Sequence, residues 1–147
     1  MKRGLILLSI FLFILPTMVR ADAAELKSVE ELVQSADGKP VVIMYWATWC
    51  ETCLSDLSEL EDFYAAAGEK VDVYSVNATN SERSEKQVQA FIRQSALKVP
   101  VFLDKDGSIA KEFRQVAVPF TILVDRKGKH RVIPGPVTKQ QLEEWIQ

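Results

Sequence analysis

The chain has 147 residues, with 18 Lys and Arg against 20 Asp and Glu and a formal net charge of −2. This length is enough for one compact domain around one hydrophobic core. Residues of both signs are interspersed without a basic patch, and only the N-terminal segment is strongly apolar. The composition therefore argues against nucleic-acid binding and against a protein with several membrane spans.

The N-terminal segment has the pattern of a targeting sequence. A positive start at Lys2 is followed by an almost wholly apolar run over residues 4–15 and by small residues at cleavage-type spacing over residues 19–23. We predict a secretory signal peptide over residues 1–23, with an uncleaved membrane anchor as the alternative. In either case we expect residues 24–147 to form a single domain outside the cytoplasm.

The first half of this domain predicts alternating helices and strands. The expected elements are a short helix after the capping-box pattern Ser28-x-x-Glu31, a buried strand over residues 41–46, a helix with Leu54, Leu57, Leu60, Tyr64 and Ala65 on its apolar face, and a strand over residues 71–76. A strand–helix–strand order of this kind makes the two strands parallel.

The second half predicts a third helix, three further strands and a last helix. The helix starts at Ser84, a short strand covers residues 101–103, two strands over residues 120–124 and 130–133 form an antiparallel hairpin, and Thr138-x-x-Gln141 caps the last helix. The expected fold is therefore α/β, with a central mixed sheet, a terminal antiparallel hairpin and helices on both faces.

The pair Cys50 and Cys53 carries the clearest chemical signal, because these are the only two cysteines in the chain. The pair follows the strand over residues 41–46 directly and stands at the start of the next helix. A helix N-terminus favours negative charge, so it stabilises the thiolate of the first cysteine, which is the form that attacks disulfides. This arrangement is typical of a thioredoxin-like redox site and predicts thiol–disulfide exchange.

Metal sites and a purely structural disulfide are the alternatives. A structural zinc site needs four Cys or His ligands, whereas the chain offers two Cys and one His, His130. Copper suits two thiolates and a histidine better. A disulfide that closes so short a ring would restrict the unfolded chain very little. We expect neither a metal nor a cofactor.

The motif Trp46-Ala-x-Trp-Cys-x-x-Cys resembles the active-site motif of the thioredoxin superfamily. Residues 99–107 and 118–128 resemble the TlpA/ResA group of bacterial, extracytoplasmic thiol-disulfide oxidoreductases, and residues 135–145 are similar to its sporulation-associated member. The resemblance implies a thioredoxin-like fold with an extra helix and strand after the second strand. It also implies exported protein substrates with disulfides and a membrane thiol-disulfide electron donor.

The resemblance also assigns roles to five residues. Cys50 matches the exposed nucleophilic cysteine, Cys53 the buried resolving cysteine, and Trp49 the active-site tryptophan. Pro119 matches the cis-proline that faces the disulfide, whereas Pro100 is expected to be trans. Asp56 stands one helical turn after Cys53, where related proteins carry a glutamate, and would exchange a proton with Cys53. The alternative for Asp56 is a solvated acid on the helix surface.

The charges near the motif favour a reductase. Glu51 and Asp56 disfavour a thiolate, and no Lys, Arg or His lies between Tyr45 and Asp62 to offset them. A less stable thiolate gives a lower reduction potential, as in proteins that reduce disulfides. A disulfide oxidase or isomerase of the same fold, and a Sco-like copper-binding chaperone that uses His130, are the alternatives.

Overall fold

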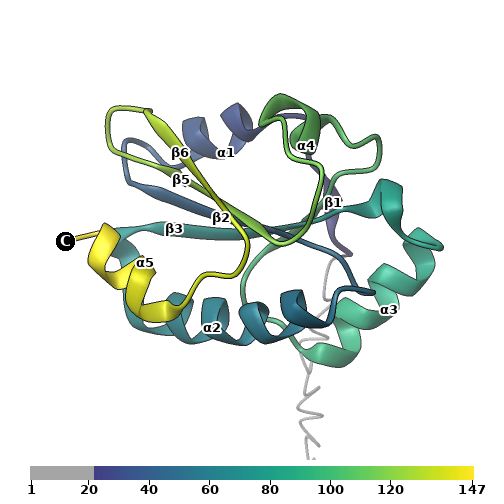
Figure 1. The fold of residues 1–147 in the computed structure, drawn as a ribbon. Coiled ribbons are helices and arrows are strands. Elements are labelled where there is room, and N and C mark those ends of the chain that lie inside the picture. Colours follow the sequence, from purple (N-terminus) through teal and green to yellow (C-terminus); the bar gives the residue numbers. More distant parts are fainter. Residues whose placement is uncertain (1–21) are drawn as a thin grey trace, which may run out of the picture.

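A six-stranded mixed sheet forms the centre of the computed structural model, which describes residues 22–147 (Figure 1). The strands are β1 (Ala24–Glu25), β2 (Val41–Trp46), β3 (Asp72–Asn77), β4 (Val101–Leu103), β5 (Phe120–Val124) and β6 (His130–Pro134), in the spatial order β1-β4-β3-β2-β5-β6. Strands β1 to β4 are mutually parallel, and β5 and β6 form the predicted antiparallel hairpin, with β5 beside β2. The predicted fold class is confirmed.

Helices cover both faces of the sheet. They are α1 (Val29–Ser35), α2 (Glu51–Ala67), α3 (Glu85–Ser95), α4 (Ser108–Glu112) and α5 (Lys139–Trp145). In Figure 1, α1 and α4 lie over one face, whereas α2, α3 and α5 lie under the other. The right-handed crossovers from β2 to β3 and from β3 to β4 explain why α2 and α3 share a face. Helix α3 and strand β4 are the extra helix and strand that the resemblance implied.

The register of the central strands brings three loops to one edge of the sheet. Trp46, the last residue of β2, pairs with Asn77, the last residue of β3. Strand β5 runs in the opposite direction, so its first residue, Phe120, pairs with Tyr45. The loops after β2 and β3 and the loop before β5 therefore meet beside Trp46. All six residues of β2 are buried, which makes this strand a rigid support for the loop that carries the cysteines.

Three details differ from the sequence expectations. Strand β1 and helix α4 were not expected, because two residues and five residues are too short to give a periodic pattern. Ser28 precedes α1 but makes no capping hydrogen bond through its side chain, so the predicted capping box is wrong. The start of α1 is held instead by the buried side chains of Leu26 and Val29. The capping box of Thr138 and Gln141 is present at the start of α5.

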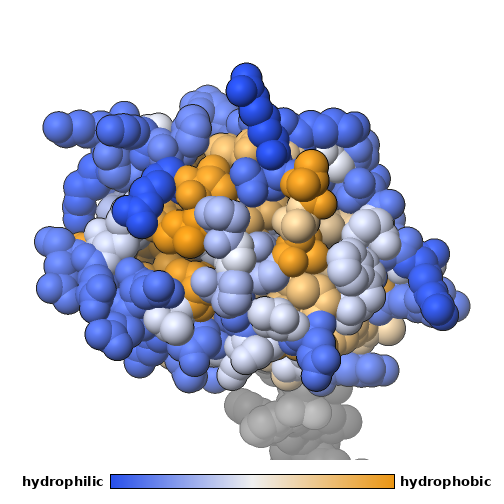
Figure 2. All heavy atoms as spheres, in the orientation of Figure 1, coloured by the Kyte–Doolittle hydropathy of each residue, from blue (hydrophilic) through white to orange (hydrophobic). Residues whose placement is uncertain are grey.

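The buried face of α2 is shifted from the predicted one. Leu57 and Leu60 are buried as expected, but Leu54 and Ala65 are exposed, and Phe63 is fully buried. The sheet meets a narrow stripe of this helix, and the edges of the predicted apolar face fall outside it. Figure 2 shows further hydrophobic side chains at the surface, over the β5–β6 hairpin and over the chain between α4 and β5.

Most of the predicted signal peptide or anchor, residues 1–23, lies outside the described residues and stays a prediction. Within residues 22–147, no helix has both the length and the apolar character needed to cross a membrane.

Candidate active site

A tight turn carries the chain from β2 into α2. The backbone N–H of Cys50 donates a hydrogen bond to the carbonyl of Ala47 over 3.2 Å, which leaves Thr48 and Trp49 as the two central residues of the turn. Cys50 has extended backbone angles and is the N-cap residue of α2. Its sulfur therefore lies at the helix end where backbone N–H groups lack partners within the helix.

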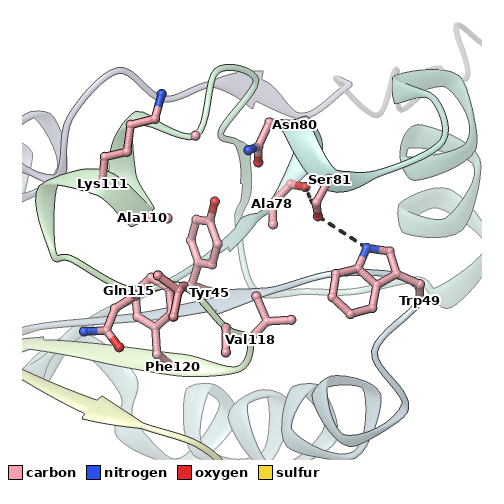
Figure 3. A pocket seen from close by; sticks show the side chains of 13 residues that line it. Tyr45, Trp49, Ala78, Asn80, Ser81, Ala110, Lys111, Gln115, Val118 and Phe120 are labelled. Carbon is pink, nitrogen blue, oxygen red and sulfur yellow. Dashed lines mark hydrogen bonds between the residues drawn. The ribbon is translucent and has the colours of Figure 1, made fainter.

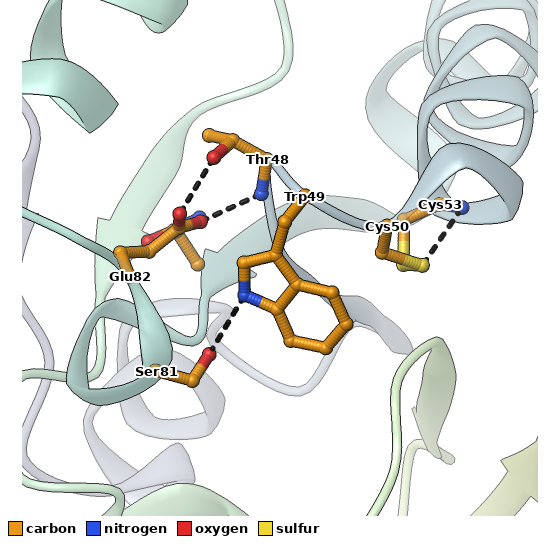
Figure 4. Close-up of a disulfide and its surroundings, with 7 residues drawn as sticks. Thr48, Trp49, Cys50, Cys53, Ser81 and Glu82 are labelled. Carbon is orange, nitrogen blue, oxygen red and sulfur yellow. Dashed lines mark hydrogen bonds between the residues drawn. A yellow bond between two sulfur atoms is a disulfide. The ribbon is translucent and has the colours of Figure 1, made fainter.

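Cys50 and Cys53 form a disulfide, with 5.2 Å between their Cα atoms (Figure 4). The backbone N–H of Cys53 donates to Cys50 Sγ over 3.2 Å. Cys50 is 9% exposed, whereas Cys53 is fully buried at 0%. Cys50 is thus the more exposed of the two cysteines, and its N-cap position is one at which a helix N-terminus stabilises negative charge.

Pro119 follows a cis peptide bond, as expected. The Val118–Pro119 bond is the one cis peptide among residues 22–147, so the bond before Pro100 is trans. Pro119 is buried and directly precedes Phe120, which pairs with Tyr45 beside the end of β2. The register thus brings the cis-proline to the edge of the sheet at which the disulfide lies.

A cleft of about 250 Å³ is lined by Trp49 and Val118, the residues that precede Cys50 and Pro119, while the two cysteines themselves do not line it. Trp49 lies at one end of the cleft, and Figure 3 shows Val118 between Trp49 and the rings of Tyr45 and Phe120. Trp49 is 61% exposed, and its Nε1 donates to Ser81 Oγ over 3.3 Å. The cleft therefore joins the residue before Cys50 to the residue before the cis-proline.

Asp56 is buried and is not a solvated surface acid. Its side chain is 6% exposed, one helical turn after Cys53. Burial raises the pKa of the Asp56 carboxyl, a hydrogen bond from the Val137 backbone N–H opposes this rise, and the negative charge of Glu59 adds to it. Oδ2 of Asp56 has no hydrogen-bond partner. The carboxyl therefore has the capacity to hold a proton.

Sequence reasoning missed a group of polar residues at the end of β3. Glu82 accepts hydrogen bonds from the backbone N–H and the hydroxyl of Thr48, and Asn77 Nδ2 donates to the same carboxylate. The position of these residues in the sequence could have indicated the group, because Asn77 ends a largely buried strand and a mostly polar segment runs from it to Glu82. Parallel neighbours such as β2 and β3 end at the same edge of a sheet.

The structure gathers no set of three His, Cys, Asp or Glu side chains suitable for a metal within residues 22–147. His130 lies on β6, where its ring meets Phe113 edge-on with 5.3 Å between the ring centroids. The site thus brings together four of the five predicted residues around the disulfide edge, with Asp56 behind Cys53.

Comparison with known proteins agrees with this geometry. The sequence profile described as the AhpC/TSA family matches residues 16–133. Sporulation thiol-disulfide oxidoreductase A of Bacillus subtilis (strain 168) is 32% identical over 112 residues, which cover 75% of this chain and 68% of the relative. Thiol-disulfide oxidoreductase ResA of Bacillus anthracis is 31% identical over 133 residues, or 89% of this chain and 73% of the relative.

A crystal structure of StoA from Bacillus subtilis superposes with a TM-score of 0.70 at 32% identity, covering 75% of this chain and 84% of that chain. The resemblance predicted from the sequence is confirmed. The chain therefore belongs to the AhpC/TSA family and, within it, to the thioredoxin-like thiol-disulfide oxidoreductases that include StoA and ResA.

Proposed function

We propose that this protein is an extracytoplasmic disulfide reductase that acts on exported proteins through the Cys50–Cys53 dithiol. The observation that carries the proposal is the contrast between Cys50, which keeps a small exposure of 9% at the start of α2, and Cys53, which is fully buried one turn inside it. This contrast assigns the first attack to Cys50, because the attacking sulfur must reach a protein substrate.

The reaction proceeds in two exchanges. The Cys50 thiolate attacks one sulfur of the substrate disulfide, which forms a mixed disulfide and releases the other substrate sulfur as a thiolate. The Cys53 thiolate then attacks Cys50 Sγ, which forms the Cys50–Cys53 disulfide and releases the second substrate sulfur. Two electrons pass from the dithiol to the substrate, and the two protons of the dithiol end on the substrate thiols. A membrane thiol-disulfide donor would restore the dithiol.

Asp56 is proposed to take the proton from Cys53 before the second exchange. A carboxyl with a raised pKa is suited to this exchange, because its affinity for the proton lies closer to that of a thiol. Its place one turn after Cys53 on the buried side of α2 supports the role.

Trp49 and Pro119 are proposed to hold the substrate chain. Trp49 and Val118 both line the cleft, and Val116 on the same loop as Val118 is fully exposed, with a relative exposure of 102%. Apolar side chains that stay exposed beside a reactive sulfur are suited to contact with a partner. An extended substrate segment joined to Cys50 would place its flanking residues in this cleft.

The charges around the disulfide support the reducing direction. Glu51 and Asp56 lie on α2, and no cation stands in the chain between Tyr45 and Asp62. Carboxylates destabilise a nearby thiolate, and a less stabilised reduced form gives a lower potential. The location outside the cytoplasm, with cleavage or anchoring, is supported by the sequence pattern of residues 1–23.

A redox titration of the Cys50–Cys53 couple against glutathione and dithiothreitol buffers tests the direction. We expect a potential closer to that of thioredoxin, about −270 mV, than to that of DsbA, about −120 mV. A value above roughly −180 mV would instead place the protein with disulfide oxidases or isomerases. Reduction of insulin disulfides by the reduced protein is the matching activity assay, and failure to reduce insulin would contradict the proposal.

A further inference from the structure

Glu82 is hydrogen-bonded to the turn that precedes Cys50. Its Oε1 accepts the backbone N–H of Thr48 over 2.6 Å, and its Oε2 accepts the Thr48 hydroxyl over 2.6 Å. Thr48 is the first central residue of the turn that ends at Cys50. The backbone N–H of that position has no partner within the turn, so Glu82 supplies the contact that fixes it.

The hydrogen bond between Thr48 and Glu82 is short, and the Glu82 carboxylate is also bonded to the end of β3. Hydroxyl-to-carboxylate distances near 2.6 Å are typical of charge-assisted hydrogen bonds. Asn77, which is fully buried at the end of β3, donates to Glu82 Oε1 over 2.9 Å and accepts from the Thr79 hydroxyl over 2.9 Å. The carboxylate is therefore held by the sheet on one side and holds the cysteine turn on the other.

The same segment also fixes Trp49. The short helix η2 (Thr79–Ser81) directly precedes Glu82, and Ser81 Oγ accepts the Trp49 Nε1 hydrogen bond. Figure 4 shows Glu82 and Ser81 contacting Thr48 and Trp49 from the same side, with the disulfide beyond. Both central residues of the turn are thus tied to one segment. Glu82 forms no ion pair within the described part of the chain, so its carboxylate serves these contacts alone.

We propose that Glu82 is a positioning residue for thiol–disulfide exchange: through Thr48 it fixes the direction in which Cys50 and Trp49 face a docked substrate. The inference rests on the proposed function, because it concerns attack on a substrate disulfide. Glu82 does not touch the sulfur itself. Its loss should therefore slow attack on a docked protein disulfide and leave the small-reagent reactivity of the Cys50 thiol nearly unchanged.

The test compares four single variants and one double variant in single-turnover reactions. Pre-reduced protein is mixed with insulin, and the second-order rate constant for loss of protein thiols is followed by acid quenching and mass spectrometry. Glu82→Ala should lower this rate constant about tenfold or more, since small errors in the geometry of attack are costly. Alkylation of Cys50 by iodoacetamide should change by less than about twofold in the same variant.

Glu82→Gln separates geometry from charge. The Gln oxygen can accept from the Thr48 N–H and from Asn77, and its amide can donate to the Thr48 hydroxyl. This variant should keep at least about half of the wild-type rate constant. Thr48→Val removes one of the three hydrogen bonds and should cost about threefold. The double variant Thr48→Val/Glu82→Ala should react as slowly as Glu82→Ala alone, because the hydrogen bond between the Thr48 hydroxyl and Glu82 is already absent in Glu82→Ala.

Glu85→Ala is the matched control, since Glu85 is an exposed acid at the first position of α3 and pairs with Lys105 on the surface. It should reduce insulin at the wild-type rate. The thermal unfolding temperature of each variant is measured to confirm that every variant is folded at the temperature of the rate measurement. A wild-type rate in Glu82→Ala, or a rate in Glu82→Gln as low as in Glu82→Ala, would overturn the positioning role. A wild-type protein that does not reduce insulin would instead overturn the proposed function.

Discussion

Asp104 joins the unexpected helix α4 to the strand that supports the active site. Its carboxylate is fully buried and accepts a hydrogen bond from the Tyr45 hydroxyl over 2.7 Å. It also accepts from the backbone N–H groups of Ile109 and Ala110 over 3.1 and 3.5 Å and from the Ser108 hydroxyl over 3.4 Å. Burial and the bond to Asp104 raise the pKa of Tyr45 far above its ordinary value, so the hydroxyl remains a donor.

The Asp104→Ala change should destabilise the protein by about 2–4 kcal/mol. The Tyr45 hydroxyl would lose its partner in a buried place, which costs about 1–3 kcal/mol. The start of α4 would lose its side-chain acceptor, which costs about 1 kcal/mol by analogy with helix caps. The backbone of Ala110 adds only a weak contact at its longer distance. Tyr45→Phe should cost less, about 1–2 kcal/mol, because the other donors to Asp104 stay in place.

Urea unfolding of the oxidised protein at pH 7 gives these free energies by linear extrapolation. Asp106→Ala is the control, because Asp106 lies in the same turn and accepts from the Ser108 backbone N–H but is exposed. Water can replace it, so its loss should cost at most about 1 kcal/mol. A cost below about 1 kcal/mol for Asp104→Ala, or an equal cost for Asp106→Ala, would refute this account of the buried network.

Two further predictions concern the cysteines and Asp56. Cys53→Ala should trap a covalent complex between Cys50 and insulin on non-reducing gels, and preferential alkylation of Cys53 in the reduced wild type would contradict that order. Asp56→Asn should lower the thiol pKa values and quicken attack at neutral pH, whereas Asp62→Asn, an exposed change on the same helix, should not. Because burial raises the pKa of Asp56, its ionised form costs stability once the pH exceeds the ordinary carboxyl range. Asp56→Asn should therefore raise the free energy of unfolding at pH 7 more than at pH 3, and superimposable thiol titrations would refute the coupling.

The sequence predicts those parts of the site that depend on residues close together in the chain. The Cys50–Cys53 spacing after a buried strand predicts both the disulfide and its place at a helix start, because both features follow from neighbours in the chain. The cis bond before Pro119 was expected from the resemblance to the TlpA/ResA group. It depends on a contact across the sheet, so spacing alone would not distinguish Pro119 from Pro100.

Contacts between distant segments could not be predicted in the same way. Glu82 stands 34 residues after Thr48, and Asp104 stands 59 residues after Tyr45, so neither pair leaves a periodic signal. Helix α4 is a related case, since its five residues depend on the buried Asp104 carboxylate for their start. In each case an acid in a polar run becomes informative only once the ends of neighbouring strands are known to meet.

The helix start and the nearby acids have opposite effects on the stability of the cysteine thiolates. A change in the charge of Asp56 can reconcile the two effects. The start of α2 stabilises a thiolate on Cys50, whereas an ionised Asp56 opposes negative charge nearby. A permanently ionised acid behind Cys53 would also oppose the thiolate that the second exchange requires. An acid whose pKa is raised by burial can instead take the proton from Cys53 and lose its own charge in the same step. The raised pKa of Asp56 would thus allow a reducing couple to form the resolving thiolate when it is needed.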